Sequence, residues 1–345
     1  MRRFAFIYWA ILAGCATNPL PTEPKVPSMN LKGELAGIPY TIRYIGDSTD
    51  YSAVIDSIFR VVYNEFSITR DGSLIDRINA FQRRDTLFCF NDSSGLFAGL
   101  YDPLRDVWRK SGGYYDPTLR PIKRAWADAL ASSKSRAVEP NLDSLYEFVG
   151  FDYSNFDVIE QFDSLDVYRE TQIRKRDPRT EIDFGKALFA YALDHVAYFF
   201  KERGLENFQL QLGTTFISSQ QSADSLGYVN VQLPDTLVSE DLDIKGQAFV
   251  FHTASDKVGL IDATYGFPVE NNIEYVGVIA PTALKAEAFA TAFLSMGIEE
   301  VMKFYGNYPD EPVDALILYR DNGVLQSAST NGFDKRLVHV SAQSE

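Results

Sequence analysis

The stretch from Lys186 to Arg203 is apolar over most of its length, and Asp194 is its only charged residue between positions 187 and 200. A segment of this length and composition predicts a buried helix, and Gly204 follows it as a typical C-terminal cap. Apolar residues then alternate over positions 208–212, which predicts a strand. A buried helix that leads into a half-buried strand requires both packed helices and a sheet, so we expect an α+β fold.

Similar patterns elsewhere predict further elements. In chain order they are a strand over 40–44, a helix over 54–66, a helix over 96–110 that Pro103 interrupts or starts, a strand over 275–280, an Ala-rich helix from a Thr282 cap to about Met296, and a hairpin that turns at 321–323. With 345 residues, 46% of them hydrophobic, the chain can bury a large core. We expect one compact unit with two lobes, mixed sheets and packed helices.

The N-terminus resembles that of a bacterial lipoprotein. Two arginines precede an apolar run over residues 4–12 that is too short to span a bilayer, and Leu12-Ala13-Gly14-Cys15 resembles a lipobox. We therefore expect residues 1–14 to be a signal peptide. Lipidated Cys15 would anchor the exported chain to a bacterial membrane on the periplasmic side. Residues 15–31 contain four prolines and are expected to form a tether, leaving 32–345 as the folded domain.

The charge of the chain argues against nucleic acid as a partner. The formal net charge is −14, whereas nucleic-acid binding needs a basic track that displaces counterions. The one basic cluster in the sequence is a short charge run, which is typical of a solvated loop. It consists of Arg174, Lys175, Arg176 and Arg179.

Four segments are dense in residues that could carry chemistry. They span 67–79, 112–126, 183–194 and 262–291, and each combines Gly, carboxylate and hydroxyl residues with apolar neighbours. Such a mixture suits a buried ligand or metal pocket. Any one segment alone is more often a set of turns and caps, because Gly, Asp, Pro and Thr are the standard turn residues.

Taken together, the order and spacing of these segments resemble the ApbE family, over roughly residues 35–332. The most specific match is Gly112-Gly113-Tyr114-Tyr115-Asp116-Pro117-Thr118, which is similar to the family's G-G-x-F-D-P-T. The block at 67–79 resembles S-x-Y-x-x-x-S, and the block at 182–194 resembles D-L-G-G-I-A-K-G-Y-A-V-D. The fourth block, at 261–268 and 286–291, resembles H-I-I-D-P-x-T-G-x-P followed by A-D-A-x-x-T.

The resemblance implies Mg²⁺-dependent transfer of FMN from FAD to a Thr or Ser hydroxyl of a partner flavoprotein. By family position, the flavin or nucleotide pocket would include Thr69, Tyr115, Asp116, Asp183 and Phe189. The metal ligands would be the Lys186 backbone carbonyl and the Glu287 and Thr291 side chains. Glu287 and Thr291 stand four residues apart on an expected helix and would share one face of it.

Several family positions are altered in this chain. The flavin-contacting Tyr is Thr69, the Lys of K-G is Phe189, the metal-binding Asp is Glu287, and the His of H-I-I-D-P is Gly259. No catalytic base is therefore assigned. His252 lies near the lost His in sequence, but a packed or surface histidine is the more common role for such a residue.

Loss of a general base typically costs about 10²–10⁴ in rate, so two hypotheses remain open. The first is a divergent, working FMN transferase. The second is a catalytically silent relative that binds a flavin, a nucleotide or a flavoprotein. The acceptor protein and the oligomeric state are not fixed by the sequence.

Overall fold

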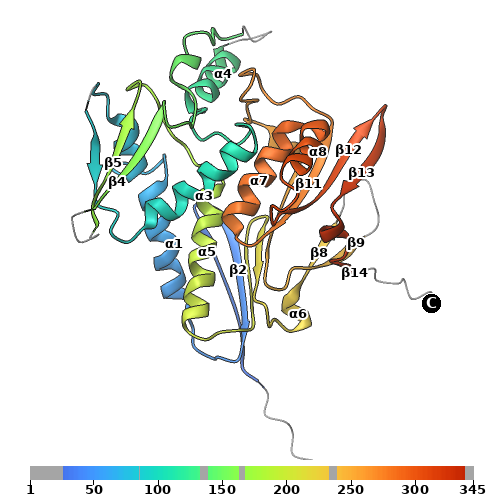
Figure 1. The fold of residues 1–345 in the computed structure, drawn as a ribbon. Coiled ribbons are helices and arrows are strands. Elements are labelled where there is room, and N and C mark those ends of the chain that lie inside the picture. The colour runs from blue at the N-terminus through green and yellow to red at the C-terminus, as the bar shows by residue number, and fades with distance from the viewer. Residues whose placement is uncertain (1–25, 85, 133–138, 163–167, 233–238, 339–345) are drawn as a thin grey trace, which may run out of the picture.

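An eight-stranded antiparallel sheet forms the centre of the molecule (Figure 1). The computed structural model describes residues 26–84, 86–132, 139–162, 168–232 and 239–338, so the predicted signal peptide and Cys15 lie outside the described residues. The strands of the central sheet, in spatial order, are β1 (Ser28–Leu35), β2 (Ile38–Ile45), β6 (Phe208–Leu212), β7 (Thr215–Ser218), β10 (Ala248–Thr253), β11 (Ile273–Ala280), β12 (Asp314–Asp321) and β13 (Val324–Ser329).

Two smaller sheets flank this sheet. The first has the order β3-β5-β4, and the second has the order β14-β9-β8. Their strands are β3 (Phe88–Phe90), β4 (Phe156–Phe162), β5 (Tyr168–Lys175), β8 (Tyr228–Gln232), β9 (Ser239–Asp243) and β14 (Leu337–Val338).

Helices cover one face of the central sheet. α5 packs against both α1 and α7, and α7 packs on β10 and β11 (Figure 1). The helices are α1 (Ser52–Phe66), α2 (Leu74–Ala80), α3 (Leu96–Lys110), α4 (Arg120–Ser132), α5 (Ala187–Glu202), α6 (Asp224–Gly227), α7 (Ala283–Met296), α8 (Ile298–Asn307) and α9 (Asn331–Asp334), with 3-10 turns η1 (Tyr146–Phe148) and η2 (Ala254–Lys257). Within the described residues, no helix is long and apolar enough to cross a bilayer.

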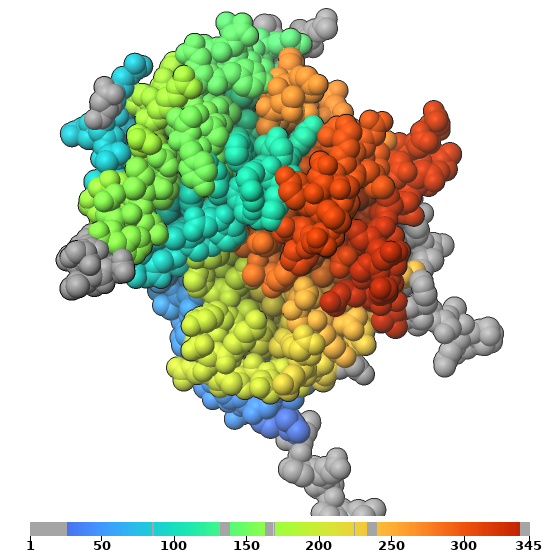
Figure 2. Space-filling view, in the orientation of Figure 1, coloured from blue at the N-terminus to red at the C-terminus, as the bar shows by residue number. Residues whose placement is uncertain are grey.

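The central sheet is buried on both faces. Along β11, Val276 and Val278 belong to the main core under the helices, whereas Tyr275 and Ile279 belong to a second core on the opposite face. A strand that is apolar on both sides reads as a continuous hydrophobic run. In the space-filling view, α3 and the chain that follows it lie directly against α7 and α8 (Figure 2). The observed architecture is the expected α+β fold.

Local sequence signals explain the elements that position the site. The Thr282 side chain accepts a hydrogen bond from the Lys285 amide and starts α7. Asp194 of α5 accepts hydrogen bonds from the amides of Ala283 and Leu284, at 2.8 and 2.9 Å. The first turn of α7 is therefore fixed to α5.

Three local expectations need correction. The helix over 96–110 is continuous, with Pro103 inside it. Strand β1 begins at Ser28, so residues 28–31 pair with β2 and are not part of a tether. The predicted solvated loop is wrong for Lys175, which ends β5 and is buried; its ammonium donates to the carbonyls of Ile78 and Thr180, and these bonds offset the cost of burial.

Candidate functional site

A cavity of about 220 Å³ lies where the turn after α3, the start of α5, the end of β10 and the C-terminal half of α7 meet. Its wall contains residues from three of the four segments singled out in the sequence. Among them are Tyr115, Asp116, Asp183, Lys186 and Thr291. His252 and Asp256 also line it.

The turn at 112–118 places Tyr115 and Asp116 at the cavity. The Asp116 carboxylate accepts hydrogen bonds from the amide and hydroxyl of Thr118, at 2.7 and 2.5 Å, and from Trp108 Nε1 at 3.2 Å. Burial raises the pKa of Asp116, although the bonds from Thr118 act in the opposite direction. Since three protein donors already bind this carboxylate, its main task is to hold the shape of the turn.

Two contacts join this turn to the start of α5. The Asp183 amide donates to the Pro117 carbonyl at 2.8 Å, and the Tyr115 hydroxyl donates to the Phe184 carbonyl at 3.2 Å. The Asp183 side chain accepts from the Gly185 amide at 2.9 Å. The structure therefore brings Asp116 and Asp183 to one cavity, as the sequence predicted.

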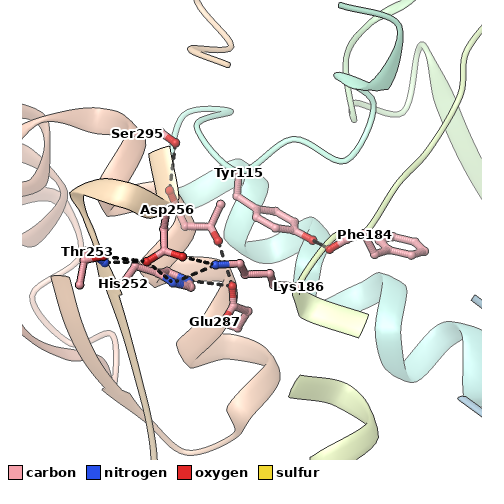
Figure 3. A network of polar contacts seen from close by, with 9 residues as sticks. Tyr115, Phe184, Lys186, His252, Thr253, Asp256, Glu287 and Ser295 are labelled. Atoms are coloured by element: carbon pink, nitrogen blue, oxygen red, sulfur yellow. Dashed lines mark hydrogen bonds and ion pairs between the residues drawn. The ribbon is translucent and has the colours of Figure 1, made fainter. Parts of the chain in front are cut away.

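A chain of polar contacts crosses the floor of the cavity (Figure 3). The Lys186 ammonium donates to Asp256 Oδ1 at 2.6 Å and lies 3.5 Å from His252 Nδ1. His252 Nε2 lies 2.9 Å from Glu287 Oε1, and the Thr291 hydroxyl donates to the same oxygen at 3.1 Å.

Burial and charge define the state of this network. His252 and Glu287 are 1% and 2% exposed. A carboxylate oxygen accepts only, so the contact with Glu287 assigns a proton to His252 Nε2, and in that tautomer Nδ1 can accept from Lys186. Burial alone would raise the pKa of Asp256, but the bonds from Lys186 and from the Thr253 amide hold it below its usual value.

Two predicted flavin positions lie away from this network. Thr69 is exposed, and its hydroxyl is 3.0 Å from the Tyr63 hydroxyl and 2.9 Å from Ser67 Oγ. Phe189 packs its ring 6.1 Å from the same Tyr63. Neither residue is in the wall of the described cavity. Thr69 and Phe189 instead both lie beside Tyr63. Phe189 is on α5, about one turn after Lys186.

The predicted metal ligands are only partly arranged for a metal. Glu287 and Thr291 do share one face of α7, but the Glu287 oxygen between them is already bound by His252. The Lys186 carbonyl accepts from the amides of Phe189 and Ala190, at 3.0 and 3.3 Å. Within the described residues, no group of three or more His, Cys, Asp or Glu side chains is placed to hold a metal ion. This donor set does not fit octahedral Mg²⁺, which needs free oxygen ligands.

The position of the family histidine does reach the cavity. Gly259 lies in its wall with φ +81°, and no other atom lies within 4 Å of the place that a Cβ would take. There is room for a side chain, but the left-handed backbone favours glycine.

Sequence reasoning missed the role of His252 and Asp256. His252 is a packed histidine, as expected, but it also lines the cavity. The available signal was the i, i+4 spacing of His252 and Asp256 at the end of an apolar run, close to the altered Gly259.

The antiparallel sheet, its helical layer and the glycine-rich turn that meets the start of α5 define an α+β protein with a polar cavity at the start of that helix. The sequence profile of the ApbE family matches residues 36–317, and the chain belongs to that family.

Individual relatives agree with this assignment. The chain is 22% identical over 310 residues to the FAD:protein FMN transferase of Escherichia coli (strain K12), covering 83% of this chain and 84% of that protein. It is 26% identical over 287 residues to the protein of that name from Buchnera aphidicola subsp. Schizaphis graminum, covering 79% and 81%. The solved structure of flavin transferase ApbE from Vibrio cholerae superimposes with a TM-score of 0.74 at 18% identity, covering 90% of this chain and 100% of that one.

Proposed function

We propose that the chain is a transferase that moves the FMN part of FAD onto a Thr or Ser hydroxyl of a partner flavoprotein. The observation that carries the proposal is the convergence of Tyr115, Asp183 and Gly259 in one cavity. These residues come from three distant blocks that match the family. Two relatives of the chain are named FAD:protein FMN transferases.

The reaction sets clear demands on the pocket. The acceptor oxygen forms a bond to the phosphorus of FMN, the bond from that phosphorus to the AMP phosphate oxygen breaks, and the hydroxyl proton is released as AMP leaves. Such transfer relies mainly on positioning and on compensation of phosphate charge. A cavity of about 220 Å³ is below the ~300–1,000 Å³ of sites that enclose a whole drug-sized ligand. It would therefore take the reacting part of FAD and leave the remainder along the adjoining surface.

The family resemblance implies a Mg²⁺ ion in this reaction. Its expected ligands, the Lys186 carbonyl, Glu287 and Thr291, are engaged in bonds within the protein. The catalytic base also stays unassigned, because Gly259 replaces the family histidine.

We also propose that the chain is exported and anchored by a lipid on Cys15. The support is the lipobox-like sequence Leu12-Ala13-Gly14-Cys15 after a short apolar run. A Cys15→Ser chain should lose its lipid and leave the membrane fraction. A Cys15→Ser chain that still carries lipid would contradict the assignment.

The test of transfer uses the full-length chain with FAD and an acceptor protein of an ApbE-family transferase. Intact-mass measurement should show one added FMN on the acceptor, with EDTA or Mg²⁺ present in parallel samples. The matched control is the acceptor with its target Thr changed to Val. FAD binding without added FMN in either sample would instead identify a silent relative.

A further inference from the structure

We infer that the Lys186 ammonium, in place of a divalent cation, neutralises the diphosphate of the nucleotide in this pocket. The inference rests on the proposed function, because the diphosphate is that of FAD. It concerns how this chain holds the substrate and is separate from whether transfer follows.

Lys186 is placed and oriented for this task. It immediately precedes α5 and lines the cavity, and its side chain is 51% exposed, so a ligand can reach it. Figure 3 shows the side chain extended over His252 toward Asp256. An ammonium has three N–H donors. Asp256 and His252 take two of them, and the third is available to a phosphate oxygen.

The carboxylate expected to bind a metal is committed elsewhere. Glu287 is 2% exposed, and its Oε1 faces the Nε2–H of His252 and the hydroxyl of Thr291. A Mg²⁺ ion at about 2.0–2.1 Å from that oxygen would compete with both of these partners. Within the described cavity wall, Lys186 already provides a full positive charge beside the same network.

Asp256 has a distinct role under this assignment. Its carboxylate holds Lys186 at 2.6 Å and would repel an arriving phosphate by like charge. An Asn at this position keeps an oxygen for the Thr253 amide, which Asp256 Oδ2 binds at 2.8 Å. Removing the charge alone should therefore strengthen anion binding. For a metal site, loss of a nearby carboxylate would have the opposite effect.

The experiment measures binding of FAD, ADP and riboflavin to the full-length chain by flavin fluorescence and calorimetry, in EDTA and in Mg²⁺. FAD and ADP should bind equally well in both. Lys186→Gln should weaken both roughly 10- to 100-fold, as expected for loss of a charge-assisted hydrogen bond, and Lys186→Arg should retain most of the affinity. Riboflavin, which has no phosphate, should bind wild type and Lys186→Gln alike. Asp256→Asn should bind FAD and ADP more tightly than wild type does.

The matched control is Lys303→Gln, since Lys303 is paired with Glu300 on the surface of α8. Lys123→Gln tests the other lysine of the cavity wall. The inference is overturned if binding requires Mg²⁺, if Lys186→Gln binds FAD like wild type, if Lys123→Gln has the larger effect, or if Asp256→Asn weakens binding. Should Lys186→Gln fail to fold, the Arg and Asp256 variants still decide the question. FAD binding that needs Mg²⁺ would overturn this inference alone, whereas metal-free binding without transfer would overturn only the proposed function.

Discussion

His252 Nε2 lies 2.9 Å from Glu287 Oε1, and the two residues are 1% and 2% exposed. The pair connects β10 in the sheet to α7 in the helical layer. Because both groups are buried, each depends on the other for its hydrogen bond. The pair thus fixes the rotation of α7 at the cavity.

Removal of the imidazole should destabilise the fold. His252→Ala leaves the Glu287 carboxylate buried with Thr291 as its remaining donor, and the free energy of unfolding should fall by about 3 kcal/mol. The measurement is urea unfolding followed by circular dichroism. The matched control is His195→Ala, because His195 Nε2 has no hydrogen-bond partner in the described part of the chain. Equal losses in the two variants would mean that the His252–Glu287 bond does not stabilise the fold.

Thr291→Val separates a lysine-based site from a metal-based one. The substitution keeps the shape of the side chain and removes the hydroxyl that donates to Glu287 at 3.1 Å. FAD affinity in EDTA should change little, and the free energy of unfolding should fall by about 1 kcal/mol. Fluorescence titration measures the FAD affinity, and urea unfolding measures the free energy of unfolding. A large loss of FAD affinity restricted to Mg²⁺-containing samples would point to a metal ligand at Thr291.

Asp194 should make stability depend on pH. Burial raises its pKa to about 7, although the amides of Leu284 and Ala283 act in the opposite direction. The folded chain therefore binds this proton more tightly than the unfolded chain does. The stabilisation is complete below about pH 4 and is lost as the pH rises through about 7.

Asp194→Asn should remove this part of the pH dependence. The difference in unfolding free energy between wild type and variant should change between pH 4 and 7, by up to about 1.4 kcal/mol per pH unit. Thermal unfolding across that range provides the measurement. Parallel curves for the two proteins would show that Asp194 titrates alike in the folded and unfolded chains.

A glycine pair tests backbone strain at the cavity. Gly259 has φ +81° and open space around the Cβ position, whereas Gly306 lies inside α8 with equally open space. Gly259→Ala should lower the free energy of unfolding by about 1 kcal/mol. Gly306→Ala should raise it by about 0.5–1 kcal/mol, since alanine favours a helix. An increase in both variants would show that the 259 turn relaxes without strain.

Sequence patterns predicted the elements whose signals are local. The helix over 96–110 has the bounds expected, and the Thr282 cap and the turn at 321–323 are confirmed, with positive φ at Asn322 and Gly323. Strand β5 was missed because its end is charged. The Lys175 ammonium is stabilised inside the protein by hydrogen bonds to the carbonyls of Ile78 and Thr180.

The site was predictable where family blocks supplied it and not where it depends on packing. Asp116 and Asp183 were expected to meet, and they do. His252 and Glu287 are 35 residues apart, and their contact is set by how α7 lies on β10. No pattern along the chain encodes that distance.

The carboxylate of Asp194 joins two helices that carry opposite ends of the polar network. α5 begins next to Lys186, and Glu287 lies one turn inside α7, whose first amides are bound to α5. These two hydrogen bonds tie the start of α7 to α5. A ligand that pulls on Lys186 therefore cannot shift Glu287 by sliding α5 along α7. Adaptation to the substrate must come from side-chain rotation and from the short η2 turn that carries Asp256. The pocket is thus preorganised on the side formed by the helices and adjustable only at the edge formed by η2.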